Sequence, residues 1–217
     1  MPNATRSDSP LRRIRLHAHP LSGHAHRVEL FLSLLGLPFE KVAVDLARAE
    51  HKSPAFLMLN PFGQLPVIED GDLVLADSNA ILVYLALTYD AEGRWLPRDA
   101  IGAARVQRWL SVAAGQLASG PAAARVAVLF GRPLDQAPRD AAARLFTLME
   151  QHLATQDYFA AAHPTIADVA LYSYTAHAPE GGVSLAPYPR LRRWLDRIEA
   201  LPRFVALGRS ALPEATA

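Results

Sequence analysis

The chain has 217 residues, of which 51% are hydrophobic and 20% charged, and 22 basic and 21 acidic side chains leave a formal charge of +1. This composition is typical of a globular protein with one large or two small domains. The balanced charge excludes a nucleic-acid footprint, and no apolar run approaches the roughly 18 residues of a membrane span. We therefore expect no nucleic acid and no membrane among its partners.

The sequence contains no cysteine. This excludes disulfides, thiolate zinc sites and every mechanism with a protein thiol as nucleophile. Eight histidines are present, but none has the H-E-x-x-H spacing or the fixed carboxylate partner of a metal site. The polar residues 1–13 lack the apolar segment of a secretory signal. We expect a frayed start, a cytoplasmic protein and no metal.

The first third of the chain predicts alternating strands and helices. Residues 13–18 alternate in hydrophobicity, as in a strand, and residues 28–35 carry apolar side chains at helical spacing until Gly36 ends the run. Residues 39–44 predict a second strand, parallel to the first across that helix. A short helix is expected within residues 45–59.

Residues 65–75 predict a β-hairpin. Two short apolar strands, at 65–68 and 73–75, are joined by Asp70-Gly71, a dipeptide suited to a tight turn. Asp77 and Ser78 then precede a helical run. An acid and a hydroxyl therefore stand at a helix N-terminus, which is a favourable place for an anion.

Pro66 stands where the first strand of this hairpin begins. A proline there cannot donate a hydrogen bond to the sheet, and two interpretations are open. It is either an ordinary proline of an edge strand, or a cis proline that turns the main chain of Leu65 outward. In the second case an extended peptide could pair with Leu65 as an added strand does.

The remainder of the chain predicts helices only, after a connector at residues 88–97. Two amphipathic stripes are expected to be core, one at Val106, Trp109, Leu110 and Ala113, the other at Leu145, Leu148, Met149 and Leu153. Gly120-Pro121 and residues 131–133 punctuate this half, and residues 134–138 are expected to form a loop. Thr165 and Asp168 have the spacing of a capping box, and a last helix begins near Tyr188.

Two motifs in this sequence resemble the glutathione transferase family. Residues 60–68 match N-P-x-G-x-[LVI]-P-x-[LI], and residues 77–81 match [DE]-S-x-A-I at the family's separation. Thr165 to Asp168 matches the family's [ST]-[IV]-A-D, and the resemblance extends from about Leu11 to Gly208. It implies a thioredoxin-like α/β domain at 11–90, an all-α domain at 101–217 and a homodimer. Within the family, the lack of cysteine argues against the branches with an active-site cysteine and favours a hydroxyl at the catalytic position. The resemblance is to bacterial, serine-type members similar to the theta and delta classes.

The resemblance implies a catalytic role for Ser22, which lies in the predicted loop between the first strand and the first helix. In theta-like and delta-like relatives a serine here donates a hydrogen bond to the sulfur of glutathione. The alternative is a plain helix N-cap. The segment before Arg27 is one residue longer than the theta-like pattern, which leaves His24 as a second candidate for activating the thiol.

The resemblance also assigns the groups that hold glutathione. His51 and Lys52 would meet the glycyl carboxylate, although the pair also fits a solvated loop. The remaining assignments are the main chain of Leu65 for the cysteinyl backbone, Gln64 beside it, Ser78 for the γ-glutamyl carboxylate and Asp77 for the γ-glutamyl ammonium.

The implied reaction joins the glutathione thiolate to a small hydrophobic electrophile, a detoxification chemistry with glutathione as co-substrate. Two alternatives are open from the sequence. One is a glutathione-binding or protein-interaction module on this fold without transferase chemistry, because a binding pocket can outlive its chemistry. The other is a glutathione-dependent dehalogenase or isomerase.

Overall fold

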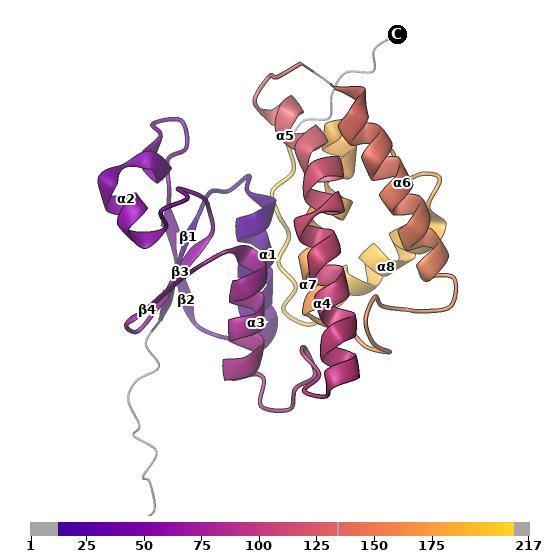
Figure 1. Ribbon diagram of the computed structural model, residues 1–217, viewed down its shortest axis with the longest axis horizontal. Helices are drawn as coiled ribbons and strands as arrows, with labels where there is room; N and C mark the ends of the chain where they lie inside the picture. The colour runs from indigo at the N-terminus through magenta and orange to yellow at the C-terminus, as the bar shows by residue number, and fades with distance from the viewer. Residues whose placement is uncertain (1–12, 134, 211–217) are drawn as a thin grey trace, which may run out of the picture.

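The structure is a computed structural model, which describes residues 13–133 and 135–210. Two parts lie side by side: a small sheet with helices on both faces, and a set of helices that begins at Ala100 (Figure 1). This arrangement confirms the predicted fold class, a thioredoxin-like α/β domain followed by an all-α domain. The domain limits of 11–90 and 101–217 stay predictions, and the expectation for the first twelve residues lies outside the described range.

The sheet has four strands in the order β2-β1-β3-β4, with the bounds Phe39–Ala43, Ile14–Ala18, Val67–Asp70 and Leu73–Ala76. β1 is parallel to β2 and antiparallel to β3, and β3 is antiparallel to β4, which confirms the predicted hairpin. The predicted turn is wrong by one residue. Asp70 pairs with Leu73, so the loop consists of Gly71 and Asp72.

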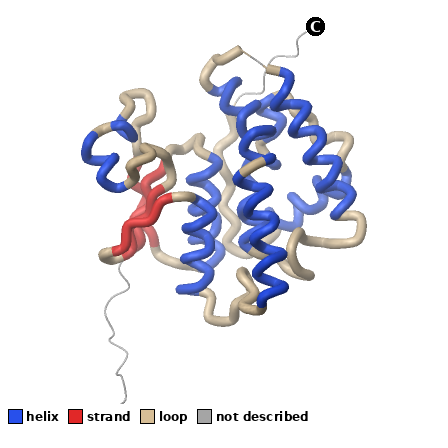
Figure 2. Tube along the Cα trace, viewed as in Figure 1, coloured by secondary structure: helices blue, strands red, loops and turns tan. Residues whose placement is uncertain are grey.

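Three α-helices and one 3-10 turn complete the first domain: α1 (Gly23–Leu35), η1 (Glu50–Lys52), α2 (Pro54–Leu59) and α3 (Ser78–Tyr89). Helices α1 and α3 cover one face of the sheet and α2 lies on the other (Figures 1 and 2). Leu16, Phe31 and Leu82 are completely buried between the sheet and these helices. The connector begins at Asp90 and not at Thr88 as predicted, because α3 runs on through Tyr89.

The second domain contains five α-helices in the described residues: α4 (Ala100–Ala114), α5 (Ala123–Leu129), α6 (Gln136–His152), α7 (Ile166–Ala176) and α8 (Pro189–Glu199). Within these residues no strand follows β4, as predicted. Two shorter segments are η2 (Ala118–Ala122), which is π-helical, and η3 (Ala178–Gly181). Gly120 and Pro121 were expected to interrupt the helices, but both lie within η2.

Two expectations for this domain are corrected in α6. The helix begins at Gln136, so Pro138 lies in its first turn and not in a loop. Proline lacks an N–H, and this costs little in the first turn of a helix. Leu148 was expected to be core, but it faces solvent and is 62% exposed. The other three members of that stripe, Leu145, Met149 and Leu153, are buried.

The run from Ala100 to Leu129 is long and apolar enough, by length and composition, to cross a membrane. In the fold, however, Val106, Leu110 and Ala113 on α4 are buried, and α4 packs against α7. The run therefore contributes one buried face to the second domain, along α4, η2 and α5.

Helix α7 is the centre of the second domain, and its residues from Ile166 to Thr175 are all buried. Its predicted capping box is confirmed: Thr165 caps the helix, and Asp168 Oδ2 accepts the N–H of Thr165 at 2.9 Å. Asp168 Oδ1 also accepts the N–H of Phe159 at 3.1 Å and Nε1–H of Trp194 at 3.0 Å. The carboxylate thus joins α7, α8 and the segment before α7.

Residues 203–210, the returning segment, come back from α8 and run between α1 and the helices of the second domain (Figure 1). Ser33 Oγ donates to the carbonyl of Arg203 at 2.7 Å, and His26 Nε2 donates to the carbonyl of Val205 at 2.9 Å. Further along, Ser210 Oγ donates to Glu180 Oε2 at 2.6 Å. The returning segment therefore ties the two domains together along α1.

Candidate active site

One cavity of about 810 Å³ opens at the edge of the first domain, between the loop before α1, the segment from Leu46 to Pro66 and the start of α3. Its lining includes every site residue that the sequence predicts: Ser22, His24, His51, Lys52, Gln64, Leu65, Asp77 and Ser78. Helix α4 contributes no residue to this lining. The cavity is built by the first domain alone.

Ser22 is the N-cap of α1. Its Oγ accepts the N–H of Ala25 at 3.2 Å, and its own N–H donates to the carbonyl of His19 at 2.9 Å. The oxygen is used as an acceptor, but among the described residues no group accepts the hydroxyl hydrogen of Ser22. The two sequence interpretations are therefore compatible, because the same hydroxyl can cap the helix and still donate into the cavity.

The first amides of α1 contact the side chain of Tyr174. The hydroxyl of this buried tyrosine lies against the amides of Gly23 and His24. A Cβ on Gly23 would stand 2.8 Å from the tyrosine ring, so only glycine fits here. The positive end of α1 is thus partly satisfied from within the protein, by Tyr174 and by the Ser22 cap.

His24 lies in the cavity wall and is held in its neutral form. Burial, and secondarily the charge of Arg27, lower the pKa of His24 to about 3. Its ring packs edge-on against Tyr174, and its Nδ1 lies 3.4 Å from Ser78 Oγ. A histidine whose pKa is lowered in this way is a weak base toward a thiol with a pKa of about 8.5, so its environment favours Ser22 over His24.

The start of α3 presents an acid, a hydroxyl and a buried cation. Asp77 has a φ of 72°, a region that non-glycine residues rarely occupy, and its Oδ1 accepts the N–H groups of Asn79 and Ala80 at 2.9 Å each. Arg27, 1% exposed, donates from Nη1 to Ser78 Oγ at 2.9 Å. Ser78 Oγ therefore lies between the buried guanidinium of Arg27 and, at a longer 3.4 Å, Nδ1 of His24.

The peptide bond between Leu65 and Pro66 is cis. Among the described residues, neither the N–H nor the C=O of Leu65 takes part in a hydrogen bond, so both are open to a ligand in the cavity. The loop before it is fixed by the buried Asn60, whose Oδ1 accepts the N–H of Phe62 at 3.1 Å and whose Nδ2 donates to the carbonyl of Gln64 at 2.9 Å. Gln64 itself is exposed at the rim.

Lys52 has a structural partner as well as a place in the lining. Its Nζ donates to the carbonyls of Phe62 at 3.1 Å and Gly63 at 3.0 Å, so it braces the loop and keeps one N–H for a ligand. Gly63 has a φ of 58°, and a Cβ there would stand 2.7 Å from that nitrogen. His51 Nδ1 is buried with no partner among the described residues. Neither residue of the pair is a purely solvated loop side chain.

Sequence reasoning missed the supporting residues of this site. Asn60 stood in the recognised motif without an assigned role, and Arg27 was noted only for its spacing. Their functions depend on side chains folding inward onto Gln64 and Ser78, which no local pattern announces. Tyr174 is further away still, because it reaches the site from the other domain.

The first domain is thioredoxin-like and is joined to a helical domain. Its cavity offers open main-chain groups, two hydroxyls and a cation, which suit a small peptide-like ligand. The comparisons with known proteins identify the family. Residues 13–87 match the family "Glutathione S-transferase, N-terminal domain", and residues 129–202 match "Glutathione S-transferase, C-terminal domain". The chain belongs to the glutathione S-transferase family.

Curated relatives and solved structures agree. The chain is 37% identical over 203 residues to glutathione S-transferase 3 of Zea mays, covering 88% of this chain and 91% of the relative, and 32% identical to glutathione S-transferase theta-2 of Homo sapiens, covering 83% and 78%. A glutathione S-transferase structure from Pseudomonas fluorescens aligns with a TM-score of 0.84 at 33% identity, covering 89% of this chain and 98% of the other. A homologue from Drosophila mojavensis with bound glutathione aligns with a TM-score of 0.80 at 30% identity, covering 88% and 89%. The chain is thus a transferase enzyme with glutathione as its co-substrate.

Proposed function

We propose that the hydroxyl of Ser22 donates a hydrogen bond to the sulfur of bound glutathione and so stabilises the thiolate that attacks the second substrate. The observation that carries this proposal is the geometry of Oγ, which accepts the N–H of Ala25 and keeps its hydrogen for the cavity. Only the thiolate is a good nucleophile, and a free thiol has a pKa of about 8.5. A donor to the charged sulfur lowers that pKa and raises the thiolate fraction at neutral pH.

The remaining groups of the cavity hold the tripeptide in an extended form. The open N–H and C=O of Leu65 pair with the cysteinyl backbone, as an added strand does. Ser78, supported by Arg27, takes the γ-glutamyl carboxylate, and Asp77 takes the γ-glutamyl ammonium. At the other end the spare N–H of Lys52 and the ring of His51 meet the glycyl carboxylate, with Gln64 at the rim.

The second substrate is proposed to be a small apolar compound with an electrophilic carbon, and the reaction a detoxifying conjugation. Leu21, directly before Ser22, is 36% exposed and offers an apolar surface beside the sulfur position. A screen of electrophiles against the purified enzyme tests this. Turnover confined to charged acceptors would contradict it.

A homodimer is proposed as the assembly. Phe62 and Met58 are 79% and 85% exposed, an unusual position for such large apolar side chains, and both lie on the first domain beside the cavity. A partner subunit that covers them would remove this surface from water. Light scattering that gave the mass of one chain at micromolar concentration would contradict this.

The catalytic proposal is tested by titrating bound glutathione. Thiolate absorbance in the ultraviolet, followed against pH at saturating glutathione, should show the bound thiol titrating below its free pKa of about 8.5. In Ser22→Ala the shift should shrink, while affinity for glutathione stays within a few-fold.

Ser78→Ala is the matched variant, because it removes another hydroxyl from the same cavity. It should weaken glutathione binding roughly ten- to hundred-fold, the value of a charge-assisted bond of about 1.5 to 3 kcal/mol, without moving the thiol pKa. A bound thiol that titrates like free glutathione in the unmodified protein would contradict the role given to Ser22.

A further inference from the structure

The loop that carries Ser22 is held by a charged side chain from the other domain. Arg125 on α5 is 1% exposed, and its Nη1 donates to the carbonyl of Leu21 at 2.8 Å. Leu21 directly precedes Ser22. The second domain, which contributes nothing to the lining of the cavity, therefore reaches the catalytic loop from behind.

Arg125 is itself fixed by Glu180 in the short turn η3. Its Nε donates to Glu180 Oε2 at 2.7 Å, and the two side chains are 1% and 4% exposed. Glu180 is further bonded to His177 Nδ1 and to Ser210 Oγ. Burial raises the pKa of the Glu180 carboxyl, but the bonds from these three partners outweigh it and leave the pKa below its ordinary value. The pair is therefore ionised, and it is fixed in position.

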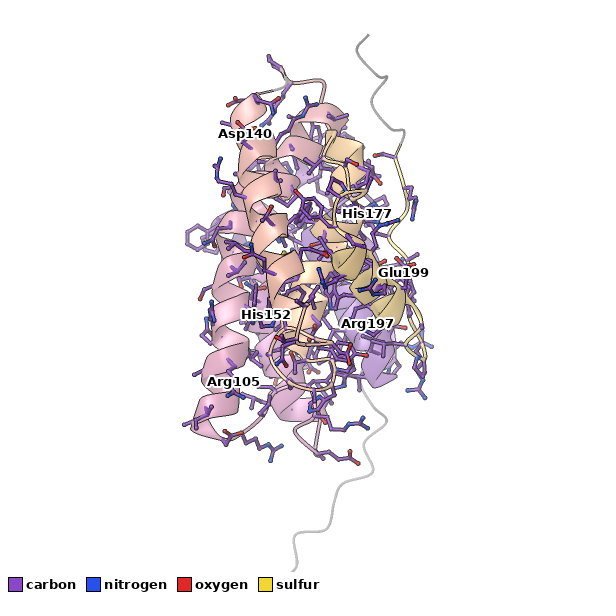
Figure 3. All side chains as sticks on the ribbon, turned by 90° about the vertical axis from the view of Figure 1, so that its right-hand side faces the viewer. Arg105, Asp140, His152, His177, Arg197 and Glu199 are labelled. Atoms are coloured by element: carbon purple, nitrogen blue, oxygen red, sulfur yellow. The ribbon has the colours of Figure 1, made fainter. Side chains whose placement is uncertain are left out.

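Close packing leaves this pair little freedom. A Cβ on Gly181, the residue after Glu180, would stand 2.6 Å from the backbone nitrogen of Arg125, so η3 rests directly on α5. Figure 3 shows His177 at the end of α7, close to the path of the returning segment. Four separate stretches of chain thus meet around one guanidinium: the catalytic loop, α5, η3 and the returning segment.

The bond to Leu21 matters because a peptide unit is planar. Arg125 holds the carbonyl at one side of the unit that joins Leu21 to Ser22, and the carbonyl of His19 holds the N–H at the other side, at 2.9 Å. With both polar groups held, the orientation of the whole unit is set. The direction in which the side chain of Ser22 projects from the main chain follows from that orientation.

We propose that Arg125, anchored by Glu180, is a positioning residue that aims the hydroxyl of Ser22 at the sulfur of glutathione. The inference rests on the proposed function of Ser22. A purely structural ion pair would support the fold without affecting the direction of the Ser22 hydroxyl. The Arg125–Glu180 pair is proposed to set that direction. A displacement of about 1 Å at a reacting group can cost up to about a hundredfold in rate.

The test uses Arg125→Lys, which keeps the buried positive charge but lacks the fork needed to reach both Glu180 and the carbonyl of Leu21. It should lower kcat by at least about tenfold, with the KM for glutathione within about twofold of the unmodified enzyme. The bound thiol should also titrate at higher pH, as in Ser22→Ala. Arg139→Gln is the matched control, because Arg139 Nε donates to the carbonyl of Gly181 at 3.1 Å and does not contact the loop.

A double-mutant cycle separates positioning from support of the fold. If Arg125 acts through Ser22, adding Arg125→Lys to Ser22→Ala should reduce kcat by less than about twofold. Equal effects of Arg125→Lys in both backgrounds would overturn the proposal, as would a kcat equal to that of Arg139→Gln.

Where Arg125→Lys does not fold, Glu180→Gln takes its place. It keeps the shape and the arginine but weakens the anchor, and it should shift kcat and the thiol titration in the same direction by a smaller factor. Unchanged kcat and titration in Glu180→Gln would overturn the proposal. An unmodified enzyme whose bound thiol titrates like free glutathione contradicts the function of Ser22 itself, which is a different result.

Discussion

Helices α1 and α7 both begin with a hydroxyl residue, and the two starts are used differently. At α7, Thr165 is completely buried, and its Oγ1 both accepts the N–H of Ala167 and donates to Asp168 Oδ2. At α1, Ser22 is half-buried, and its Oγ accepts from Ala25 but donates to no described residue. The hydroxyl that caps α7 donates within the fold, whereas the hydroxyl that caps α1 has no acceptor among the described residues and can donate to a ligand.

The difference shows how a common local device acquires a function. Both residues satisfy an amide that a helix start leaves open, which is enough to explain their place in the sequence. What distinguishes them is the surrounding space: core around Thr165, and a cavity of about 810 Å³ beside Ser22. A cap becomes a candidate catalytic group when its donor faces a cavity and other groups in that cavity hold a ligand.

The largest expected effect comes from a variant that disrupts the start of α7, where the cap serves the fold. Asp168→Ala removes the acceptor of four buried donors: the N–H of Phe159, the N–H and hydroxyl of Thr165, and Nε1–H of Trp194. Each unsatisfied donor costs about 1 to 3 kcal/mol, and with some relaxation we expect the free energy of unfolding to fall by about 3 to 5 kcal/mol. Urea denaturation measures this.

Asp99→Ala is the control for that variant, since Asp99 caps α4 at an exposed position by accepting the N–H of Gly102 at 2.9 Å. It should cost only about 1 kcal/mol. Equal losses in Asp99→Ala and Asp168→Ala would mean that the buried network adds nothing to an ordinary cap. The kcat of folded Asp168→Ala should match the unmodified enzyme.

A second, smaller effect is on the pH dependence of stability, through a histidine at the contact between α1 and α7. His26 on α1 bonds Ser173 Oγ on α7 and the carbonyl of Val205, and burial lowers the pKa of His26 from 6.5 to about 4. Between these values the unfolded chain takes up a proton that the folded protein does not, so stability falls as pH drops. From pH 6.5 to 5 this amounts to about 2 kcal/mol.

The variant His26→Gln keeps an acceptor and a donor but does not titrate. Its unfolding free energy should therefore fall less steeply over the same pH range, with the remaining slope due to His24 and His177, whose pKa values are also lowered by burial. Above pH 7 the two proteins should differ by a constant amount. Parallel curves from pH 7 to 5 would show that His26 takes up its proton as readily in the folded protein as in the unfolded chain, and would contradict the lowered pKa.

The smallest expected effect on stability concerns Ser22 at the start of α1. Ser22→Gly removes the hydroxyl, yet glycine is a tolerated N-cap, so the free energy of unfolding should fall by only a few tenths of a kcal/mol. Turnover should nevertheless fall as in Ser22→Ala. If Ser22→Gly instead lost stability and kept its turnover, the roles of the two helix starts would be reversed.

The sequence was sufficient for the parts of this molecule that rest on local chemistry. Alternation, helical spacing and the two motifs predicted the order of strands and helices, the hairpin, the capping box and eight residues that line one cavity. The errors arose where tertiary contacts decide. Pro138 is accepted in the first turn of α6, and Leu148 faces solvent although its spacing suits a core.

The supporting groups of the site were beyond reach for the same reason. Nothing in the neighbourhood of Arg125 or Tyr174 indicates that these residues would meet the loop around Ser22, because the contact joins segments about a hundred residues apart or more. Arg27 looks like any helical arginine until its burial beneath Ser78 is seen. Motifs report what meets the ligand, whereas the fold decides what holds those groups in place.

The returning segment has a consequence for how the protein is made. The bond from His26 to Val205 joins residues 179 positions apart. At a synthesis rate of about 5 to 20 residues per second, α1 leaves the ribosome roughly 10 to 40 s before its partner exists. Throughout that interval the first domain is a nascent chain with one side of α1 uncovered, so chaperones that bind apolar segments during translation have a defined window in which to act on it.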